Sequence, residues 1–326
     1  MSARDSVFVE AGARLHFGVL DLRGALGRRF GGLGAAIPSP SLLLEAGRAE
    51  GGVSAEGPDS ARAAEFARRF LGFHGVGGGA RLVVHRRIPA HSGLGSGTQL
   101  GLSVARALAE LYGLSAQPAD LARAVSRGRR SAIGTWAFAL GGFIVEGGRR
   151  TGADGIAPLL GRYEVPERWR CVVAVPPGNP GLSGEAEAAA FERLPAPASQ
   201  EVERVSHLVL MQLLPCLVEG DLPGFGQALS EVQRITGTWF APQQGGVFAP
   251  GRGEELVRRM AGWGAAGVGQ SSWGPAVYGL VADADEGLAL AARCREFLGG
   301  NGLVFEGGFA RGGARVGHGA PPVRAD

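Results

Sequence analysis

Glycines at alternate positions mark the part of this chain best suited to bind an anion. Residues 88–102 read IPAHSGLGSGTQLGL, so an apolar strand-like run is followed by Gly93, Gly95 and Gly97 and then by a helix-like run. Small residues leave backbone N–H groups accessible at the start of a helix, where the helix dipole also favours negative charge. Ser96 and Thr98 add hydroxyls that can bond a phosphate oxygen or a metal-bound water. The stretch predicts a phosphate-binding loop; the alternative is a ligand-free turn with Thr98 as the helix N-cap.

Two common nucleotide-binding loops do not fit this stretch. A dinucleotide-binding loop needs a third glycine where Thr98 stands, and an acid at the end of a second strand, whereas Glu110 lies in a helix-like run. A Walker A loop needs a lysine, and all 33 basic residues of this chain are arginine. The absence of lysine also excludes a Schiff base, while arginine remains well suited to phosphates and carboxylates.

The composition is typical of a packed globular protein. The chain has 326 residues, of which 45% are hydrophobic, and its formal net charge is +3. Basic residues form no block of the kind that binds nucleic acid or a membrane surface, so we expect small-molecule substrates as partners. The three cysteines show no metal-binding or redox spacing, and no signal peptide or membrane-spanning run is visible. We therefore expect a cytoplasmic protein.

Strand-like and helix-like segments alternate irregularly, which favours an α+β fold over a doubly wound sheet. Strands are expected at residues 6–22, 41–49, 80–88 and 141–148, and helices at residues 61–73, 98–114 and 118–130. A new strand near residue 170 opens a second set of elements. We expect two domains, residues 1–165 and 166–310, and a disordered tail at 311–326, where apolar residues are sparse.

Five stretches in order resemble one enzyme family. PAHSGLGSGTQ is similar to the phosphate-loop motif of the galactose, homoserine, mevalonate and phosphomevalonate (GHMP) kinase superfamily. Within that superfamily its form resembles the beta-ribofuranosylaminobenzene 5'-phosphate synthases. RLHFGVLDLRGALGRRFGGLG, RGRRSAIGTWAFALGGFIVEGG, GLSGEAEAAAF and GVGQSSWGPAVYGL resemble the same family. The resemblance implies a ribosomal protein S5 domain 2-like N-terminal domain, a ferredoxin-like C-terminal domain, a site between them, and a homodimer.

One departure from the kinase pattern bears on the reaction. Aligning Ser131 and the pair Gly141–Gly142 with the kinase motif places Gly134 where the kinases carry a catalytic Asp. A hydroxyl nucleophile benefits from such a carboxylate, so its absence argues against phosphoryl transfer to an alcohol.

The reaction that the resemblance implies is a decarboxylating C-ribosyl transfer for tetrahydromethanopterin biosynthesis. Phosphoribosyl pyrophosphate and 4-aminobenzoate or 4-hydroxybenzoate would give a C-riboside, pyrophosphate and CO2, with Mg2+ and without ATP. An ATP-dependent small-molecule kinase and a non-catalytic ligand-binding paralogue are the alternatives.

The candidate site residues follow from these motifs and this resemblance. The catalytic candidates are His91, Arg14 and Arg130. Candidates for substrate binding are Gly93, Gly95, Ser96, Gly97, Thr98, Gln99, His16, Asp21, Arg127, Ser131, Gln270, Ser271, Ser272 and Trp273. Ser96 and Thr98 are also candidates for contact with the metal, directly or through water.

Overall fold

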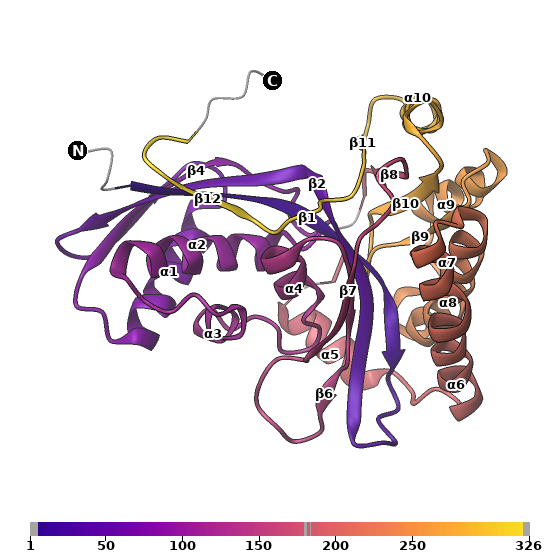
Figure 1. Cartoon of the computed structure of the whole chain (residues 1–326), viewed down its shortest axis with the longest axis horizontal. Helices are drawn as coiled ribbons and strands as arrows, with labels where there is room; N and C mark the ends of the chain where they lie inside the picture. Colours follow the sequence, from indigo (N-terminus) through magenta and orange to yellow (C-terminus); the bar gives the residue numbers. More distant parts are fainter. Residues whose placement is uncertain (1–5, 179–180, 183, 322–326) are drawn as a thin grey trace.

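Two sheets organise the chain in the computed structural model, which describes residues 6–178, 181–182 and 184–321 (Figure 1). Within these residues the first sheet contains β1 (Ser6–Asp21), β2 (Arg28–Ala49), β3 (Val53–Glu56), β4 (Gly79–Arg86), β5 (Phe143–Glu146), β6 (Arg149–Arg150), β7 (Leu159–Tyr163) and β12 (Arg315–His318). The second contains β8 (Arg170–Val175), β9 (Gly267–Gln270), β10 (Val277–Val281) and β11 (Leu303–Gly307). Mostly antiparallel pairing with helices on the sheets confirms the α+β class.

The β1–β2 hairpin connects the two halves of the molecule. Residues 43–49 of β2 pair with β4, and residues 32–35 of β2 pair with β5. Strand β1 also packs against the C-terminal helix α8 (Leu222–Gln244). The register of the hairpin shifts after Gly12 and again after His16, so the strands bend there. A Cβ on Gly12 would lie 2.2 Å from the carbonyl oxygen of Ile37, so the close approach of the strands requires glycine. The bend places the residues of β1 near position 14 at the junction of the halves.

Four helices cover one face of the first sheet (Figure 1): α1 (Ser60–His74), α2 (Ser96–Tyr112), α3 (Pro118–Ala124) and α4 (Ile133–Leu140). Helix α2 packs on β1 and β2 through buried leucine, valine and alanine side chains. The helix expected at residues 118–130 ends at Ala124, because Ser126 and Gly128 adopt positive φ values of 55° and 77° and turn the chain. This turn places Arg127 and Arg130 on a loop that faces the first turn of α2.

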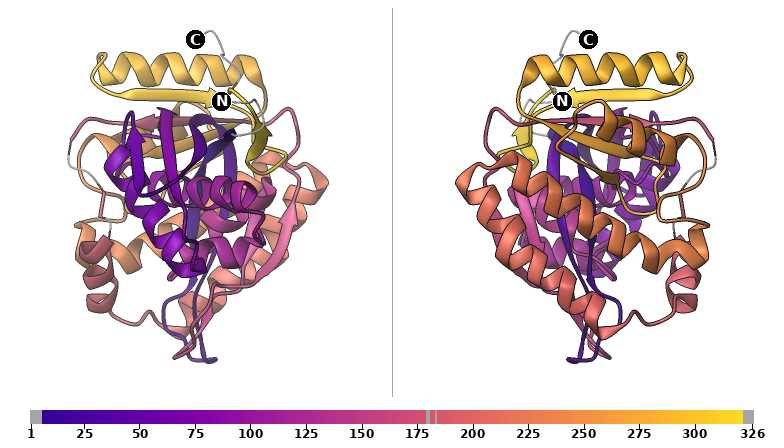
Figure 2. Two further views of the ribbon diagram at one scale, coloured as in Figure 1. Left: turned by 90° about the vertical axis from the view of Figure 1, so that its left-hand side faces the viewer. Right: turned by 90° about the vertical axis from the view of Figure 1, so that its right-hand side faces the viewer.

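The C-terminal half contains the four-stranded sheet and the remaining helices. They are α5 (Gly184–Arg193), α6 (Ser199–Leu208), a π-helical turn (Val209–Leu213), α7 (Leu214–Glu219), α8, α9 (Arg252–Gly262) and α10 (Ala284–Leu298). Asp221 caps α8 by accepting from the backbone N–H of Gly224 at 3.1 Å. Figure 2 shows α10 lying along β11 at one end of the molecule. No helix in the described ranges is long and apolar enough to cross a bilayer.

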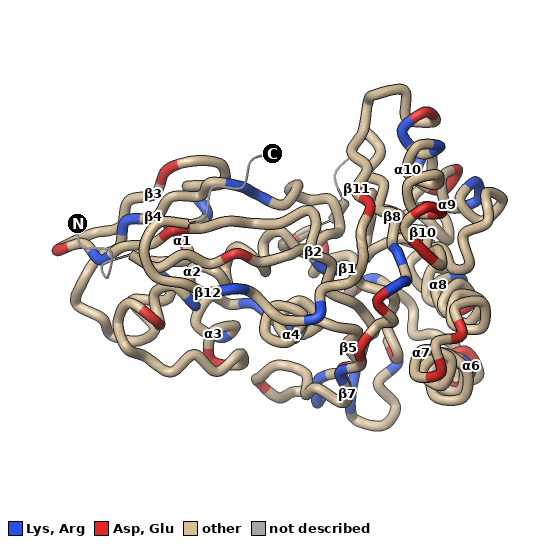
Figure 3. The backbone as a smooth tube through the Cα atoms, turned by 45° about the horizontal axis from the view of Figure 1, so that its top comes forward, with Lys and Arg blue, Asp and Glu red and all other residues tan. Residues whose placement is uncertain are grey.

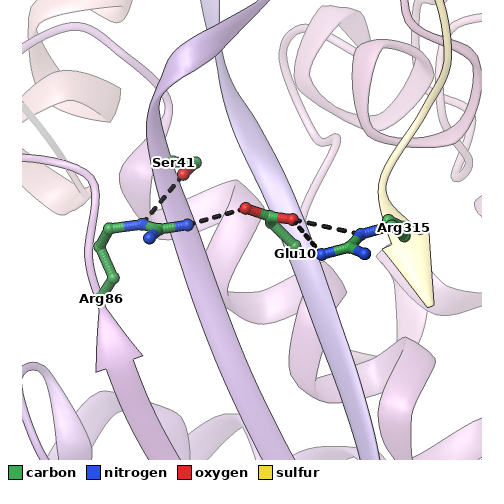
Figure 4. A network of polar contacts seen from close by, with 4 residues as sticks. All are labelled: Glu10, Ser41, Arg86 and Arg315. Atoms are coloured by element: carbon green, nitrogen blue, oxygen red, sulfur yellow. Dashed lines mark hydrogen bonds and ion pairs between the residues drawn. The ribbon is translucent and has the colours of Figure 1, made fainter. Parts of the chain in front are cut away.

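The prediction of a disordered tail is wrong for residues 311–321; residues 322–326 lie outside the described residues. Strand β12 pairs with β1, which is otherwise an edge strand whose N–H and C=O groups need partners. Glu10 accepts hydrogen bonds from Arg86 and Arg315, both at 2.8 Å, and Arg86 also donates to Ser41 (Figure 4). Edge pairing and these charges order a segment with few apolar residues.

Candidate active site

A cavity of about 690 Å³ lies where the two halves meet. Its walls come from β1, the loop after α3, α5, α8 and the segment that follows β9. One wall is cationic and the other is aromatic. Basic and acidic residues are interspersed along the backbone elsewhere (Figure 3), whereas five arginines line this cavity.

The cationic wall stands over the first turn of α2. Arg14, Arg69, Arg127, Arg129, Arg130 and Thr98 all line the cavity. A Cβ on Gly97 would lie 2.5 Å from one Nη of Arg62 and 3.3 Å from one Nη of Arg127, so both guanidinium groups cover this glycine. The helix N-cap is Gly95 at φ 80°, with no side chain capping the amides, so the N-cap role considered for Thr98 is wrong. Backbone N–H groups and two arginines therefore converge where the sequence predicted a phosphate.

Like charges crowd one another on this wall. Burial lowers the pKa of Arg127, and the neighbouring Arg62, Arg69 and Arg130 lower it further. Arg127 also stacks on the ring of Phe66. Holding guanidinium groups together is unfavourable without a counter-charge, so a bound polyanion would relieve the repulsion.

Arg14 and Ser271 fasten the glycine-rich loop to the segment after β9. Arg14 and the hydroxyl of Ser271 both donate to the carbonyl oxygen of Gly93, Ser271 at 2.7 Å. Ser271 Oγ also accepts from the backbone N–H of His16 at 3.0 Å and is fully buried. The Ser271 hydroxyl is therefore engaged on both sides in holding the loop, and its binding of substrate stays a prediction. Arg14 lines the cavity, and burial lowers its pKa to about 10, with Glu187 opposing that effect.

Gln99 and Gln270 have structural contacts. Gln99 is 1% exposed, donates to the carbonyl of Gly134 at 3.0 Å and does not line the cavity, so its contacts give no support to its prediction as a ligand. Gln270 borders the cavity, but its amide donates to Gln244 and Ser272 and accepts from Ala249. These bonds shape the loop that presents Ser272 and Trp273, both of which line the cavity.

Three other predicted residues lie away from the cavity wall. Asp21 accepts from the backbone N–H groups of Arg23 and Gly24 at 2.6 and 2.9 Å, so it closes a turn, and its binding of substrate stays a prediction. His91 is exposed, with φ 52°, and does not line the cavity, which leaves its catalytic assignment without a geometric basis. Ser96 begins α2 but does not line the cavity either.

The aromatic wall comes from the C-terminal half. Trp273 meets Phe191 and Phe240 edge-to-face, with ring centroids 5.4 and 4.7 Å apart. All three side chains line the cavity, and Trp273 is only 5% exposed. The prediction placed Trp273 against an aromatic substrate; the structure gives it both a cavity surface and a packing role.

Two carboxylates of α5 face the arginines. Glu185 and Glu187 line the cavity, and Glu187 pairs with Arg130 at 2.6 Å. Among the described residues, no group of three or more His, Cys, Asp or Glu side chains is placed to hold a metal ion. A cation here would need oxygen ligands from a substrate, which is how Mg2+ is usually held beside phosphates.

Gly134 lies against the anion loop. A Cβ at this position would lie 2.9 Å from Cγ2 of Thr98, so even alanine requires Thr98 to move. A carboxylate at this position therefore does not fit the present packing of α4 on α2.

Several residues that line the cavity or lie beside it were not predicted from the sequence. Arg62 and Arg69 lie two turns apart on α1, a helical spacing that would have placed both on one face. Glu185 and Glu187 lie in the stretch GLSGEAEAAAF, which indicated only a resemblance to the family. The sequence shows the charges of these four residues, but it does not show which faces of α1 and α5 meet across the cavity.

Comparisons with known proteins agree with this arrangement. The model of the GHMP kinases N terminal domain matches residues 60–142. The beta-ribofuranosylphenol 5'-phosphate synthase of Methanothermobacter thermautotrophicus is 35% identical over 94% of this chain and 97% of its own length. The protein of the same name from Archaeoglobus fulgidus is 34% identical over 82% of this chain and 86% of its own. Homoserine kinase from Cytophaga hutchinsonii, at 17% identity, has a similar fold, with a TM-score of 0.70 over 97% of this chain and 98% of its own.

Proposed function

Because this chain belongs to the beta-ribofuranosylphenol 5'-phosphate synthase family, we propose that it joins phosphoribosyl pyrophosphate to a 4-substituted benzoate through a carbon–carbon bond. Pyrophosphate and CO2 are released. The observation that carries the proposal is the combination of a multi-arginine anion site over Gly97 with glycine at position 134.

The cationic wall suits the sugar phosphate. Pyrophosphate and the 5'-phosphate together carry several negative charges, and the cavity offers helix N–H groups and five arginines that line it. As the bond between the anomeric carbon and pyrophosphate breaks, the bonding electrons leave with pyrophosphate. Arg127, held beside Gly97, is placed to stabilise that developing charge.

The aromatic wall suits the benzoate. The ring carbon that bears the carboxylate attacks the anomeric carbon, with electrons supplied by the para substituent. The bond to CO2 then breaks, and its electron pair restores the aromatic ring. Trp273, Phe191 and Phe240 exclude water from one side of the cavity, which favours loss of a charged carboxylate as a neutral gas.

This chemistry explains why glycine is acceptable at position 134. The group that leaves the ring carbon is CO2 and not a proton, so no strong base is required at that carbon. A kinase reaction lacks this advantage, because its hydroxyl nucleophile must lose a proton. We also propose, as the family resemblance implies, a cytoplasmic homodimer that serves tetrahydromethanopterin biosynthesis; light scattering tests the dimer.

We propose Mg2+ as the cofactor, held by the pyrophosphate oxygens together with Glu185 and Glu187. Both carboxylates line the cavity opposite the arginines, and hard oxygen ligands suit this cation. Bound there, Mg2+ would neutralise charge on the leaving group. Glu187 is already paired with Arg130, so substrate must displace that pair.

Glu187→Gln is expected to raise the Mg2+ concentration needed for half-maximal activity by about tenfold, the effect of one lost charge-assisted contact of about 1.4 kcal/mol. Activity is measured against Mg2+ at saturating substrate. Glu192→Gln, on the same helix but away from the cavity, is the control. An unchanged Mg2+ requirement in Glu187→Gln would remove this carboxylate from the proposed metal site.

The acceptor is the part of the proposal that product analysis decides. The relatives named above carry a phenol in their names, which supports 4-hydroxybenzoate over 4-aminobenzoate. Mass spectrometry of products formed from phosphoribosyl pyrophosphate with each benzoate is expected to show the decarboxylated riboside of the phenol as the favoured product. Binding of both substrates with no product from either would indicate a non-catalytic paralogue.

A further inference from the structure

Glu146 is a buried carboxyl that the proposed reaction does not use. It ends β5 and is 0% exposed. One carboxylate oxygen accepts from the backbone N–H of Ala132 at 3.3 Å, and the other accepts from the backbone N–H of Gly148 at 2.9 Å. Burial raises the pKa of Glu146 to about 7, and the hydrogen bonds from Gly148, Ala132 and Ser131 limit the rise.

A chain of hydrogen bonds leads from this carboxyl to the cavity. The Ser131 hydroxyl bonds to Glu146, and Ser131 Oγ lies 3.2 Å from Nε2 of His16. Nδ1 of His16 accepts from the backbone N–H of Gly18 at 3.3 Å, so Nε2 carries the hydrogen and donates to Ser131. Burial, followed by the charge of Arg14, lowers the pKa of His16 to about 3, so the ring stays neutral.

The three side chains come from three different elements, and Glu146 and His16 meet beside Gly32 of the hairpin. A Cβ on Gly32 of β2 would lie 3.4 Å from both Oε1 of Glu146 and Nε2 of His16. His16 and Ser131 line the cavity, while Glu146 lies behind them. His16 is the titratable side chain on β1 that faces Glu146; the loop side presents the Ser131 hydroxyl and the Ala132 and Gly148 amides.

The same contacts hold the cationic wall in place. Ala132 and Ser131 join the loop of Arg127 and Arg130 to the start of α4. Gly134, two residues further on, packs against Thr98 in the first turn of α2. The hydrogen bonds of Ala132 and Ser131 to Glu146 therefore fix the position of the loop that carries Arg127 and Arg130 relative to α2.

We propose that the ionised carboxylate of Glu146 is a positioning group for the anion site, acting through Ser131 and Ala132 on the loop of Arg127 and Arg130. This inference deepens the proposed function and rests on it for the identity of the anion. The carboxylate accepts three hydrogen bonds; protonation removes its charge and places a hydrogen on one oxygen, which weakens these bonds. The anion site should therefore be better ordered above neutrality than below it.

Stability is expected to follow the opposite trend. The carboxyl of the unfolded chain titrates near 4.5 and that of the folded chain near 7, so the folded state binds more protons between these values. The contribution of Glu146 to the free energy of unfolding falls as pH rises through this window. Glu146→Gln is thus expected to be at least as stable as the unmodified protein at pH 8, which separates positioning from a role in folding.

Calorimetric binding of inorganic pyrophosphate to the full chain tests the proposal without turnover. About one tenth of Glu146 is ionised at pH 6 and about nine tenths at pH 8. Glu146→Gln is expected to weaken binding about tenfold at pH 8 and less than about twofold at pH 6, the effect of one hydrogen bond. Titration of pyrophosphate itself is common to both proteins and cancels in the ratio. Glu164→Gln, a largely exposed carboxyl beyond β7, is the control and should match the unmodified protein at both pH values.

A ratio that is the same at pH 6 and pH 8 overturns the proposal, as does unchanged binding by Glu146→Gln at pH 8. Ser131→Ala leaves the Ala132 and Gly148 bonds intact and should show the same pH-dependent weakening, so the test holds even where Glu146→Gln does not fold. Failure of the unmodified protein to bind pyrophosphate removes the anion site and this inference together. Binding with the expected pH dependence but no ribosylated product contradicts only the proposed function.

Discussion

Replacing Arg127 with alanine is expected to raise the KM for phosphoribosyl pyrophosphate by about 10- to 150-fold, the loss of about 1.5 to 3 kcal/mol from one charged contact. The free energy of unfolding should stay the same or rise. Burial, and then the neighbouring charges of Arg62, Arg69 and Arg130, lower the pKa of Arg127, so removing it relieves an unfavourable charge in the free protein.

Steady-state kinetics and thermal unfolding of the same preparations check this result. Arg123→Ala removes an exposed arginine of α3, a few residues away, whose contact is the surface pair with Asp120. That control should keep the KM and the melting temperature of the unmodified protein. An Arg127→Ala enzyme with an unchanged KM would show that the anion binds elsewhere.

Replacing Gly93 with alanine is expected to lower the free energy of unfolding by more than about 3 kcal/mol. Gly93 has φ 81°, and a Cβ there would lie 2.3 Å from the carbonyl oxygen of Ser271 and 3.1 Å from that of Gly274. Both contacts are backbone atoms of the segment after β9, so neither can turn aside as a flexible side chain would. The clash would separate the glycine-rich loop from the segment after β9 and open the cavity.

Denaturant unfolding of Gly93→Ala and Gly72→Ala gives the comparison. A Cβ on Gly72 in α1 meets nothing within 4 Å, and alanine favours the helix, so this control should gain about 0.5 to 1 kcal/mol. Equal stability of the two variants would mean that the loops are not held in backbone contact.

The elements that position the site could be predicted where their periodicity is local. Alternating burial along β1 and the apolar face of α2 were both visible in sequence, and the loop predicted to bind phosphate lies between strand and helix at the start of α2. The end of α3 was placed too late, because positive φ at Ser126 overrides a helix-like composition. The ordered tail was missed because its order comes from pairing with β1 and from the Glu10–Arg315 ion pair, which lie 305 residues apart in sequence.

Single side chains were harder to place. Arg14, Arg127, Arg130 and Thr98 line the cavity, because a bend in β1, the loop after α3 and the first turn of α2 bring them there. Ser271 and Gln99 have the same polar character, but partners distant in sequence engage them in the interior. Glu146 gave no signal at all, since its importance depends on Ser131 and His16 meeting it from two other elements. Long-range contacts, which local spacing does not encode, decide such roles.

The fate of the benzoate carboxyl group tests the central claim most directly. The enzyme is given phosphoribosyl pyrophosphate, Mg2+ and 4-hydroxybenzoate labelled in the carboxyl carbon, with no ATP, and released gas and pyrophosphate are measured together. The account predicts labelled CO2 and pyrophosphate in equal amounts, and an unlabelled riboside that survives acid because ribose is joined to the ring through carbon. Retention of the carboxyl label in the ribosylated product, or an absolute requirement for ATP with formation of ADP, would contradict it.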